Sequence, residues 1–317
     1  MKPFPIHFAI DLEPDERLPD EANKSFDSAG VALERMLSLR SEIEAATGFP
    51  AAFGWYIRMD RHVTGLYGDA GVIAVRYKSL LDEAAQAGDE IGLHIHANER
   101  GPDGRWRANY ADEEAVLRNV DDAFASFQEV FGRTCRSVRM GDMWTSKACL
   151  RRLYECGALY DLTLESGRRP RSFASVYPGT GSKGWRPSMV GAPLAPYQPD
   201  RKDMPGFWVA PLASYPRSDF HNPRMLLLSA YSGVATGFRR RRARQMLRPQ
   251  DYYPRETRKA WIEAALAEGE QPGFCFAIRN FGDAAQIEQF LDVLMEIAKE
   301  RPLKFCAPAD YISLATA

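Results

Sequence analysis

The chain has 317 residues, of which 45% are hydrophobic, and its 41 basic and 42 acidic side chains give a formal net charge of −1 at pH 7. This length suits one large domain or two small ones, and the balanced charge excludes a global attraction to nucleic acid or to an anionic membrane. No run of about 18 apolar residues predicts a membrane span, and the first residues lack the pattern of a signal peptide, so we expect a cytoplasmic protein.

Strand and helix patterns alternate through the first half of the chain. Short apolar runs predict strands, and apolar residues spaced three and four apart predict helices. In chain order these are a strand at 4–11, a helix at 30–47, a strand at 50–60, a helix at 74–88, a strand at 89–96, a helix at 112–131, a strand at 135–140, a helix at 145–156 and a strand at 158–164. This alternation predicts a parallel sheet with helical crossovers, either closed as a barrel or open and doubly wound.

The pattern is interrupted in the second half and then resumes. Residues 166–206 are rich in Gly, Pro, Ser and Arg, and an irregular segment of that length inside a domain is usually functional. After it come a strand at 207–213, a helix at 255–268, a strand at 273–278, a helix at 283–299 and a strand at 303–308. With neither a repeat nor a clear linker, the sequence predicts a single domain over 1–317 with an irregular insertion at about 166–206.

Polar and ionisable side chains gather where the predicted strands end. They are Asp11 and Glu13, Arg58 and Asp60, His94, His96 and Asn98, Arg139, Asp142 and Trp144, Asp161, and Arg279. In parallel α/β folds the carboxyl ends of the strands meet on one face, where function collects. We therefore expect one site there, with Arg58, Asp60, Asp142, Trp144 and Asp161 as substrate contacts.

The pair His94 and His96 lies two residues apart at the end of a strand, so both side chains point the same way. Two imidazoles and a carboxylate form a good ligand set for zinc and leave a position open for water. Such a site predicts metal-assisted hydrolysis of an amide or ester. The alternative is structural: one histidine packed and the other solvated, with Asp11 and Glu13 in an acidic turn and Arg139 as an ordinary ion-pair partner.

Several of these segments together resemble the NodB-type polysaccharide deacetylases. They are the strand ending in Asp-x-Glu, "PAAFGWYIR", "GDEIGLHIH", and the arginine that opens "VRMGDMWTSKACLRRLYECGALYD". The match runs in order from about residue 6 to 165 and is similar to a divergent bacterial branch that has H-x-H in place of H-x-x-x-H. The resemblance implies an α/β fold, an irregular (β/α) barrel of about seven strands. It also implies removal of N- or O-acetyl groups with a divalent metal, commonly zinc, with nickel or cobalt as alternatives.

Position by position, the resemblance makes Asp11 the catalytic base and Glu13 the carboxylate ligand. His94 matches the first histidine ligand. The second falls on Asn98, a poorer zinc ligand, and His96 is the alternative because it faces the same way as His94. Arg139 matches the arginine that pairs with the base, and its charge would favour the ionised form of Asp11.

The late strand departs from the family pattern. Deacetylases of this kind carry a histidine there that protonates the leaving amine, whereas this chain reads "FAIRNFGD". Arg279 could stabilise an oxyanion but is too basic to release a proton at neutral pH, which leaves His221 as the remaining candidate acid. The sequence thus predicts a metal-dependent deacetylase acting on a sugar or a similar small polar molecule. The alternative is a degenerate relative that binds a saccharide or an anionic ligand.

One strongly basic segment, "GFRRRRARQMLRPQ" at 237–250, stands apart from these motifs. Such a run suits an anionic ligand such as a phosphate and could in principle contact nucleic acid. We favour a solvated helix face, since no interleaved aromatic residues or nucleic-acid motif accompany it. His62 falls in a predicted exposed loop.

Overall fold

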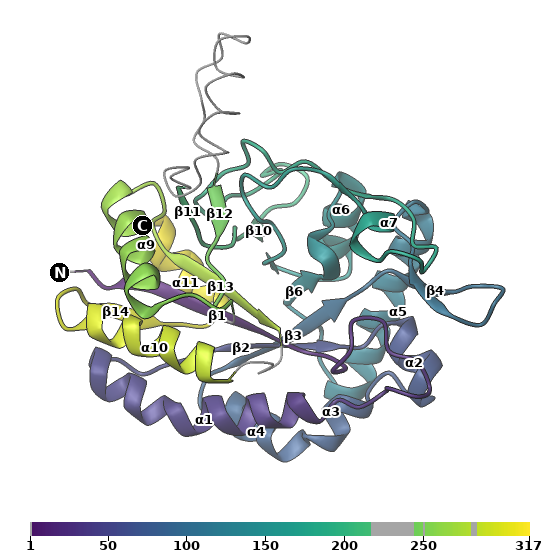
Figure 1. Cartoon of the computed structure of the whole chain (residues 1–317), viewed down its shortest axis with the longest axis horizontal. Coiled ribbons are helices and arrows are strands. Elements are labelled where there is room, and N and C mark those ends of the chain that lie inside the picture. Colours follow the sequence, from purple (N-terminus) through teal and green to yellow (C-terminus); the bar gives the residue numbers. More distant parts are fainter. Residues whose placement is uncertain (1, 217–243, 250, 280–283) are drawn as a thin grey trace, which may run out of the picture.

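Parallel strands form the centre of the computed structural model, which describes residues 2–216, 244–249, 251–279 and 284–317 (Figure 1). The sheet order is β10-β7-β6-β3-β2-β1-β13, and β14 also pairs with β1. The strands are β1 (Phe4–Leu12), β2 (Gly54–Arg58), β3 (Glu90–Ile95), β6 (Ser137–Met140), β7 (Tyr160–Asp161), β10 (Trp208–Val209), β13 (Phe274–Arg279) and β14 (Leu303–Phe305). All of these pairings are parallel, so the carboxyl ends of the strands share one face.

The sheet curls into an irregular barrel whose two edges are joined by the chain that follows β10. Ala210 N donates to Asp161 O at 2.8 Å, which keeps this chain on β7. Three residues later Ala213 N donates to Cys275 O in β13 at 2.7 Å. Backbone hydrogen bonds outside the regular ladder therefore bridge the gap, and the predicted α/β class and irregular (β/α) barrel are confirmed.

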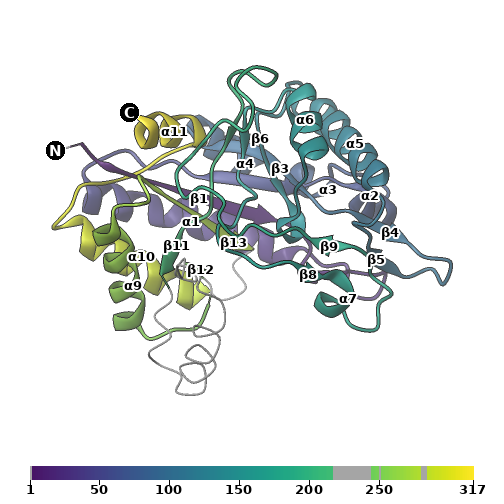
Figure 2. The ribbon, with the colours of Figure 1, turned by 90° about the horizontal axis from the view of Figure 1, so that it is seen from above.

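Helices cover the outside of the sheet. They are α1 (Asp27–Thr47), α2 (Arg61–Tyr67), α3 (Val72–Arg76), α4 (Lys78–Gln86), α5 (Glu113–Phe131), α6 (Lys147–Glu155), α7 (Phe173–Val176), α9 (Arg255–Glu268), α10 (Ala284–Ala298) and α11 (Pro308–Thr316), with a 3-10 turn η1 (Gly141–Met143). Figures 1 and 2 show α1 and α10 side by side along the sheet and α5 beside α6 farther round it. Both chain ends lie on the same side, where Lys2 Nζ donates to Leu314 O at 2.6 Å.

Three two-stranded antiparallel sheets lie outside the main sheet: β4 (Asn98–Arg100) with β5 (Trp106–Ala108), β8 (Arg171–Ser172) with β9 (Trp185–Arg186), and β11 (Ser214–Pro216) with β12 (Arg244–Met246). None of the helices in the described part of the chain combines the length and the apolar character that a bilayer crossing requires.

Alternation along β1 separates the core from the site. Ile6, Phe8 and Ile10 belong to the main hydrophobic core, whereas Ala9 belongs to a smaller cluster inside the barrel. Asp11 follows Ala9 by two residues and so faces the interior at the end of the strand. The interior is tightly filled: a Cβ on Gly92 of β3 would lie 2.4 Å from the carbonyl oxygen of Ser137.

Each of the eight predicted strands falls on a strand of this sheet, and the structure differs from the prediction mainly at element ends. The helix expected at 74–88 is interrupted at Tyr77, which has φ −107° and separates α3 from α4. The β4–β5 hairpin and α11 were not predicted. The strand expected at 303–308 stops at Phe305, and Pro308 begins α11, a position that proline favours because it needs no amide donor.

Candidate active site

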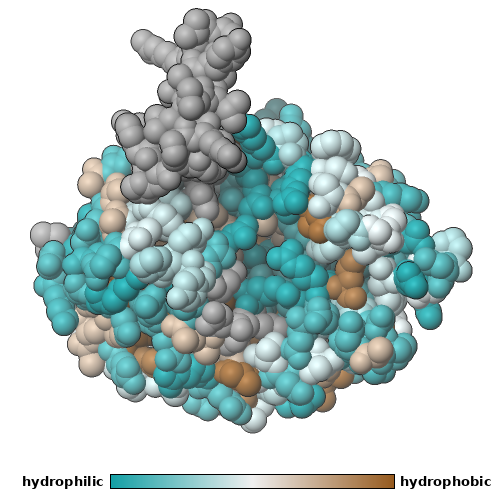
Figure 3. Space-filling model, in the orientation of Figure 1, coloured by the Kyte–Doolittle hydropathy of each residue, from teal (hydrophilic) through white to brown (hydrophobic). Residues whose placement is uncertain are grey.

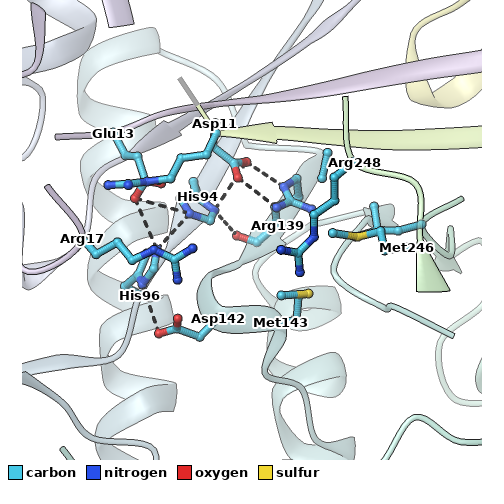
Figure 4. A pocket seen from close by; sticks show the side chains of 13 residues that line it. Asp11, Glu13, Arg17, His94, His96, Arg139, Asp142, Met143, Met246 and Arg248 are labelled. Carbon is cyan, nitrogen blue, oxygen red and sulfur yellow. Dashed lines mark hydrogen bonds and ion pairs between the residues drawn. The ribbon is translucent and has the colours of Figure 1, made fainter. Parts of the chain in front are cut away.

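A cavity of about 90 Å³ opens at the carboxyl ends of β1, β3, β6 and β13 (Figure 4). Its lining includes these residues predicted from the strand ends: Asp11, Glu13, His94, His96, Arg139, Asp142 and Arg279. Figure 3 shows that hydrophilic residues dominate this face of the molecule, with hydrophobic residues only in small separate patches. The sheet thus gathers on one face side chains that are far apart in the sequence.

Three potential metal-ligand atoms converge in the cavity. His94 Nε2 and His96 Nε2 are 3.0 Å apart, and Glu13 Oε2 lies 3.4 Å from His96 Nε2 and 3.9 Å from His94 Nε2. A point equidistant from three atoms with these separations lies about 2.0 Å from each, which is the bond length of zinc to imidazole nitrogen and carboxylate oxygen. The donor set and its spacing therefore fit a divalent transition metal.

Both imidazoles are oriented through their other nitrogen. His94 Nδ1 donates to the backbone oxygen of Arg139 at 3.0 Å, and His96 Nδ1 lies 3.5 Å from Asp142 Oδ2. This assignment leaves the Nε2 atoms to face each other and Glu13, as Figure 4 shows. Histidines that bind metals usually have such an acceptor behind them, because it fixes the tautomer and the ring orientation.

The surroundings of the two histidines act differently on their protonation. Burial lowers the pKa of His94 to about 4, so its lone pair is available at neutral pH. Burial and the charge of Arg58 oppose protonation of His96, yet the carboxylates of Asp142 and Glu13 outweigh them and raise its pKa. A proton and a metal would therefore compete for His96.

Asp142 sits on an unusual turn. Asp142 and Met143 both have φ 54°, in the left-handed region that non-glycine residues rarely occupy. Tyr177 Oη donates to Asp142 Oδ1 at 2.6 Å, and Tyr110 Oη donates to Oδ2 at 3.1 Å. Burial opposes ionisation of Asp142, but the hydrogen bonds from His96 and Tyr177 outweigh it and lower its pKa to about 2. Strain of this kind is characteristic of functional sites.

Asp11 and Arg139 form a buried bidentate pair. Arg139 Nε donates to Asp11 Oδ1 at 2.6 Å, and Nη2 donates to Oδ2 at 2.8 Å. Arg139 Nη1 donates to the backbone oxygen of Leu162 at 3.0 Å, which fixes the guanidinium plane. Asp11 Oδ1 is 3.7 Å from His94 Nδ1. The contact expected between these two residues is present, and it holds Asp11 beside the ligand cluster.

Glu13 is paired in the same way from β13. Arg279 Nε donates to Glu13 Oε1 at 2.5 Å, and its Nη2 donates to the backbone oxygen of Pro14 at 3.1 Å. Burial opposes ionisation of Glu13, but the positive charge of Arg279 and the neighbouring histidines outweigh it and hold the pKa of Glu13 well below its usual value. Glu13 is therefore anionic at neutral pH.

Arg58 and Asp60 lie beneath the cavity, not in its lining. Both are 0% exposed, so their positions give no support to the expectation that they contact substrate. Asp60 Oδ2 accepts from Arg58 Nε at 2.8 Å and from the backbone amide of His96 at 2.9 Å. Arg58 Nη1 is 3.8 Å from Glu13 Oε2. The pair thus supports two members of the ligand cluster from below.

Asn98 is turned away from the ligand cluster. Its Nδ2 donates to His62 Nδ1 at 2.9 Å, and it lines a second cavity of about 360 Å³ beside the β4–β5 hairpin. His62 is only 1% exposed, so the expected exposed loop was wrong there. Its Nε2 donates to Pro19 O at 2.9 Å, and burial lowers its pKa to about 3. Of the two alternatives for the second nitrogen ligand, the geometry favours His96.

Trp144 and Asp161 also lie outside the cavity lining. Trp144 is 6% exposed and packs against Tyr110 with ring centroids 5.5 Å apart. Asp161 is 1% exposed and accepts a hydrogen bond from Thr163 Oγ1, and burial raises its pKa to about 6. The expected substrate contacts of both residues therefore have no support from their positions. His221 and residues 280–283 lie outside the described residues.

Several lining residues were not predicted. They are Arg17, Met143, Leu212, Met246, Arg248 and Ala277. Arg248 belongs to the basic run at 237–250, of which residues 244–249 are described. Those residues begin with β12, so the favoured helix face is wrong for that part. The sequence signal for Arg248 was the arginine-rich run at 237–250, which the other motifs did not explain. Nothing in the sequence indicated that Arg248 lies near the carboxyl ends of the strands.

No protein-family model matches the chain, and no curated protein sequence matches it. Several solved structures, however, match the chain in fold. A polysaccharide deacetylase structure from Mycobacterium smegmatis is 13% identical over 100% of this chain and 91% of its own, with a TM-score of 0.55.

Two further structures match about equally well. A probable polysaccharide deacetylase from Pseudomonas aeruginosa PAO1 is 12% identical over 98% of this chain and 90% of its own, and the Puue allantoinase is 13% identical over 98% and 89%. Both have a TM-score of 0.53. At these identities the similarity concerns the fold. The chain therefore has the fold of the polysaccharide deacetylases, although it shares only 12 to 13% of its residues with these three structures.

Proposed function

We propose that the chain is a metal-dependent hydrolase of the deacetylase type, which removes an acyl group, N-acetyl in the first instance, from a sugar or a related small polar molecule. The observation that carries this proposal is the convergence of Glu13 Oε2, His94 Nε2 and His96 Nε2 around one point at zinc-ligand distance. A divalent ion held there, zinc or alternatively nickel or cobalt, supplies polarisation of an acyl carbonyl and acidification of water.

The chain's own residues divide the remaining work. Asp11 lies beside His94 and accepts a proton from the attacking water, as a general base does. Arg139 holds the Asp11 carboxylate by two hydrogen bonds and so fixes its direction. Arg58 and Asp60 hold the backbone at His96 and the side chain of Glu13. Asp11 and Arg139 thus line the cavity, whereas Arg58 and Asp60 support the ligand cluster from behind the lining.

The acid that protonates the leaving group is the open part of this mechanism. Within the described part of the chain, the cavity lining contains the imidazoles of His94 and His96 and no other. Arg279 remains the proposed stabiliser of the oxyanion, although its Nε holds Glu13. His221 remains the proposed acid. An ester, whose leaving group needs less help from an acid, is the simpler substrate if His221 does not serve.

The test combines metal content with acetate release. We expect protein purified without added metal to take up about one equivalent of zinc, cobalt or nickel, and to release acetate from N-acetylated or O-acetylated sugars only when loaded. Glu13→Gln removes a ligand charge, whereas Glu288→Gln is the matched control because Glu288 also accepts from an arginine Nε, at 2.7 Å from Arg35. Loss of metal in Glu13→Gln alone supports the proposal.

Two results contradict it. Wild-type protein that takes up no metal removes the basis of the site. Protein that binds sugars but releases no acetate in any metal form favours the alternative, a degenerate deacetylase-fold protein that binds a saccharide or an anionic ligand.

A further inference from the structure

The cavity wall carries more positive than negative charge. Its lining carboxylates are Asp11, Glu13 and Asp142, and its lining guanidinium groups are Arg17, Arg139, Arg248 and Arg279. A divalent ion at the ligand point would add two further positive charges. A neutral substrate leaves this excess charge without a counterpart.

The four arginines fall into two kinds. Arg139 and Arg279 are engaged with Asp11 and Glu13 at 2.5 to 2.8 Å. Arg248, by contrast, forms no ion pair within 4.0 Å with any carboxylate of residues 2–216, 244–249, 251–279 or 284–317, and the same holds for Arg17, which lies near Tyr177 and Asp142. The excess positive charge is therefore carried by Arg17 and Arg248.

These two arginines come from distant parts of the chain and reach the same space. Arg17 follows β1 in the loop that also carries Glu13, and Arg248 follows β12. Figure 4 shows their side chains extending into the cavity from different walls, Arg17 beside His96 and Arg248 beside Arg139. Met143 and Met246 lie next to Arg248 and give that wall an apolar part. Met side chains adapt well to a carbon skeleton.

Resting on the proposed function, we propose that the substrate carries an anionic oxygen group, a carboxylate or a phosphate, in the same small molecule as the acyl group, and that Arg248 and Arg17 bind it. A guanidinium group presents several donors in one plane and matches the oxygens of either anion. The apolar wall accommodates the carbon atoms between the two groups. A plain neutral glycan offers these arginines only uncharged acceptors and no negative charge.

Equilibrium binding tests this inference without any turnover. The probes are glucosamine, glucosamine 6-phosphate and muramic acid, which share a sugar ring and differ in having no anion, a phosphate or a carboxylate. We expect one of the two anionic sugars to bind about 10-fold or more tightly than glucosamine by calorimetry, as a charge-assisted hydrogen bond supplies. The stronger of the two identifies the anion.

The variants are Arg248→Gln and Arg17→Gln, with Arg248→Lys as a partial rescue. Arg151→Gln is the control, since Arg151 is exposed and pairs with Asp203 at 3.2 Å on the surface. We expect the anion preference to fall about 10-fold in Arg248→Gln and to persist in the control. Titrations with chelator-treated protein separate anion binding by arginine from anion binding by a metal.

Equal binding of glucosamine and of the two sugars that carry an anionic group overturns the inference, and so does an anion preference that survives in both glutamine variants. The proposed function fails separately. If the arginine-dependent preference is present but the loaded protein releases no acetate from the N-acetylated forms of the same sugars, the anion site stands and the hydrolase does not.

Discussion

The two sides of the cavity are built differently. On the strand side, Asp11, Glu13, His94 and Arg139 are each at most 6% exposed and are held by hydrogen bonds or ion pairs. On the loop side, Arg17 and Arg248 are more exposed and have no carboxylate partner among the described residues. The groups proposed to take part in the reaction are thus held rigidly at the strand ends, whereas the groups proposed to bind the substrate come from loops.

The difference also has an energetic meaning. Removing one member of a buried ion pair leaves the other charge desolvated and unpaired, which costs several kcal/mol, whereas an exposed charge loses little. Substitutions on the two sides should therefore separate in stability as well as in activity. The following changes test that separation.

The largest effect is expected for Asp11→Asn. Loss of the proposed base should lower kcat about 10² to 10⁴-fold, and the weakened partner of Arg139 should cost about 3 kcal/mol of unfolding free energy. Acetate release and urea unfolding measure the two effects. Asp203→Asn, in an exposed pair with Arg151, is the control and should change neither. If Asp11→Asn and Asp203→Asn had equal effects on kcat and on the unfolding free energy, the proposed difference between buried and exposed ion pairs would be wrong.

Asp161 provides a further test of strand-end residues, because it is the last residue of β7 but does not line the cavity. Among the described residues, no hydrogen-bond partner reaches its Oδ2. Burial raises its pKa from 3.8 to about 6, so the folded state holds this proton more tightly than the unfolded state. The resulting stability is present below the unfolded pKa and is lost as pH rises through about 6.

Asp161→Asn removes this titration. We expect the unfolding free energy of the variant, relative to wild type, to rise by about 2 kcal/mol between pH 4 and pH 7. Urea unfolding at both pH values measures it. A difference that is constant with pH would show that folding does not raise the pKa of Asp161.

Asp60→Asn tests the support beneath the ligands. Asp60 joins Arg58 to the amide of His96, so the substitution should loosen the ligand cluster while leaving the cavity lining unchanged. We expect metal affinity to fall about 10 to 100-fold, as for other groups that orient metal ligands. Competition with a chromophoric chelator measures the affinity, with Asp122→Asn as a surface control. Unaltered affinity would leave Asp60 only its role as the N-cap of α2, where its Oδ1 accepts from the backbone amides of His62 and Val63.

The smallest effect is expected for the stability of Arg248→Gln. Since Arg248 is half-buried and has no ion pair with a described carboxylate, its replacement should change the unfolding free energy by less than about 0.5 kcal/mol. Thermal unfolding measures this. A loss of 2 kcal/mol or more in unfolding free energy would show that Arg248 stabilises the fold, as the buried strand-side residues do.

Much of the strand side could be predicted from the sequence. Apolar runs placed all eight strands, and alternation along β1 and β3 brought Asp11, Glu13, His94 and His96 to one face. The choice between His96 and Asn98 was left open by the motif. The geometry favours His96, because β3 ends at Ile95 and Asn98 already belongs to β4, where its side chain contacts His62.

The loop side could not be predicted, for physical reasons. Periodicity carries no information about where an irregular loop returns to the sheet, so Arg17 and Arg248 were missed. The position of Asp142 depends on two successive left-handed residues, which composition does not reveal. Arg58 and Asp60 were placed correctly near a strand end, but their burial could not be predicted. It accompanies tertiary contacts with α2, where Arg58 Nη2 lies 2.8 Å from His62 Nδ1 and Asp60 accepts from the amides that begin the helix. The single-domain boundary remains a prediction.

Anomalous diffraction from crystals soaked in zinc tests the central claim most directly. The account predicts one strong peak within about 2.0 to 2.2 Å of Glu13 Oε2, His94 Nε2 and His96 Nε2, and no such peak in Glu13→Gln crystals. A peak bound by other residues, or no peak in wild-type crystals at saturating zinc, would contradict it.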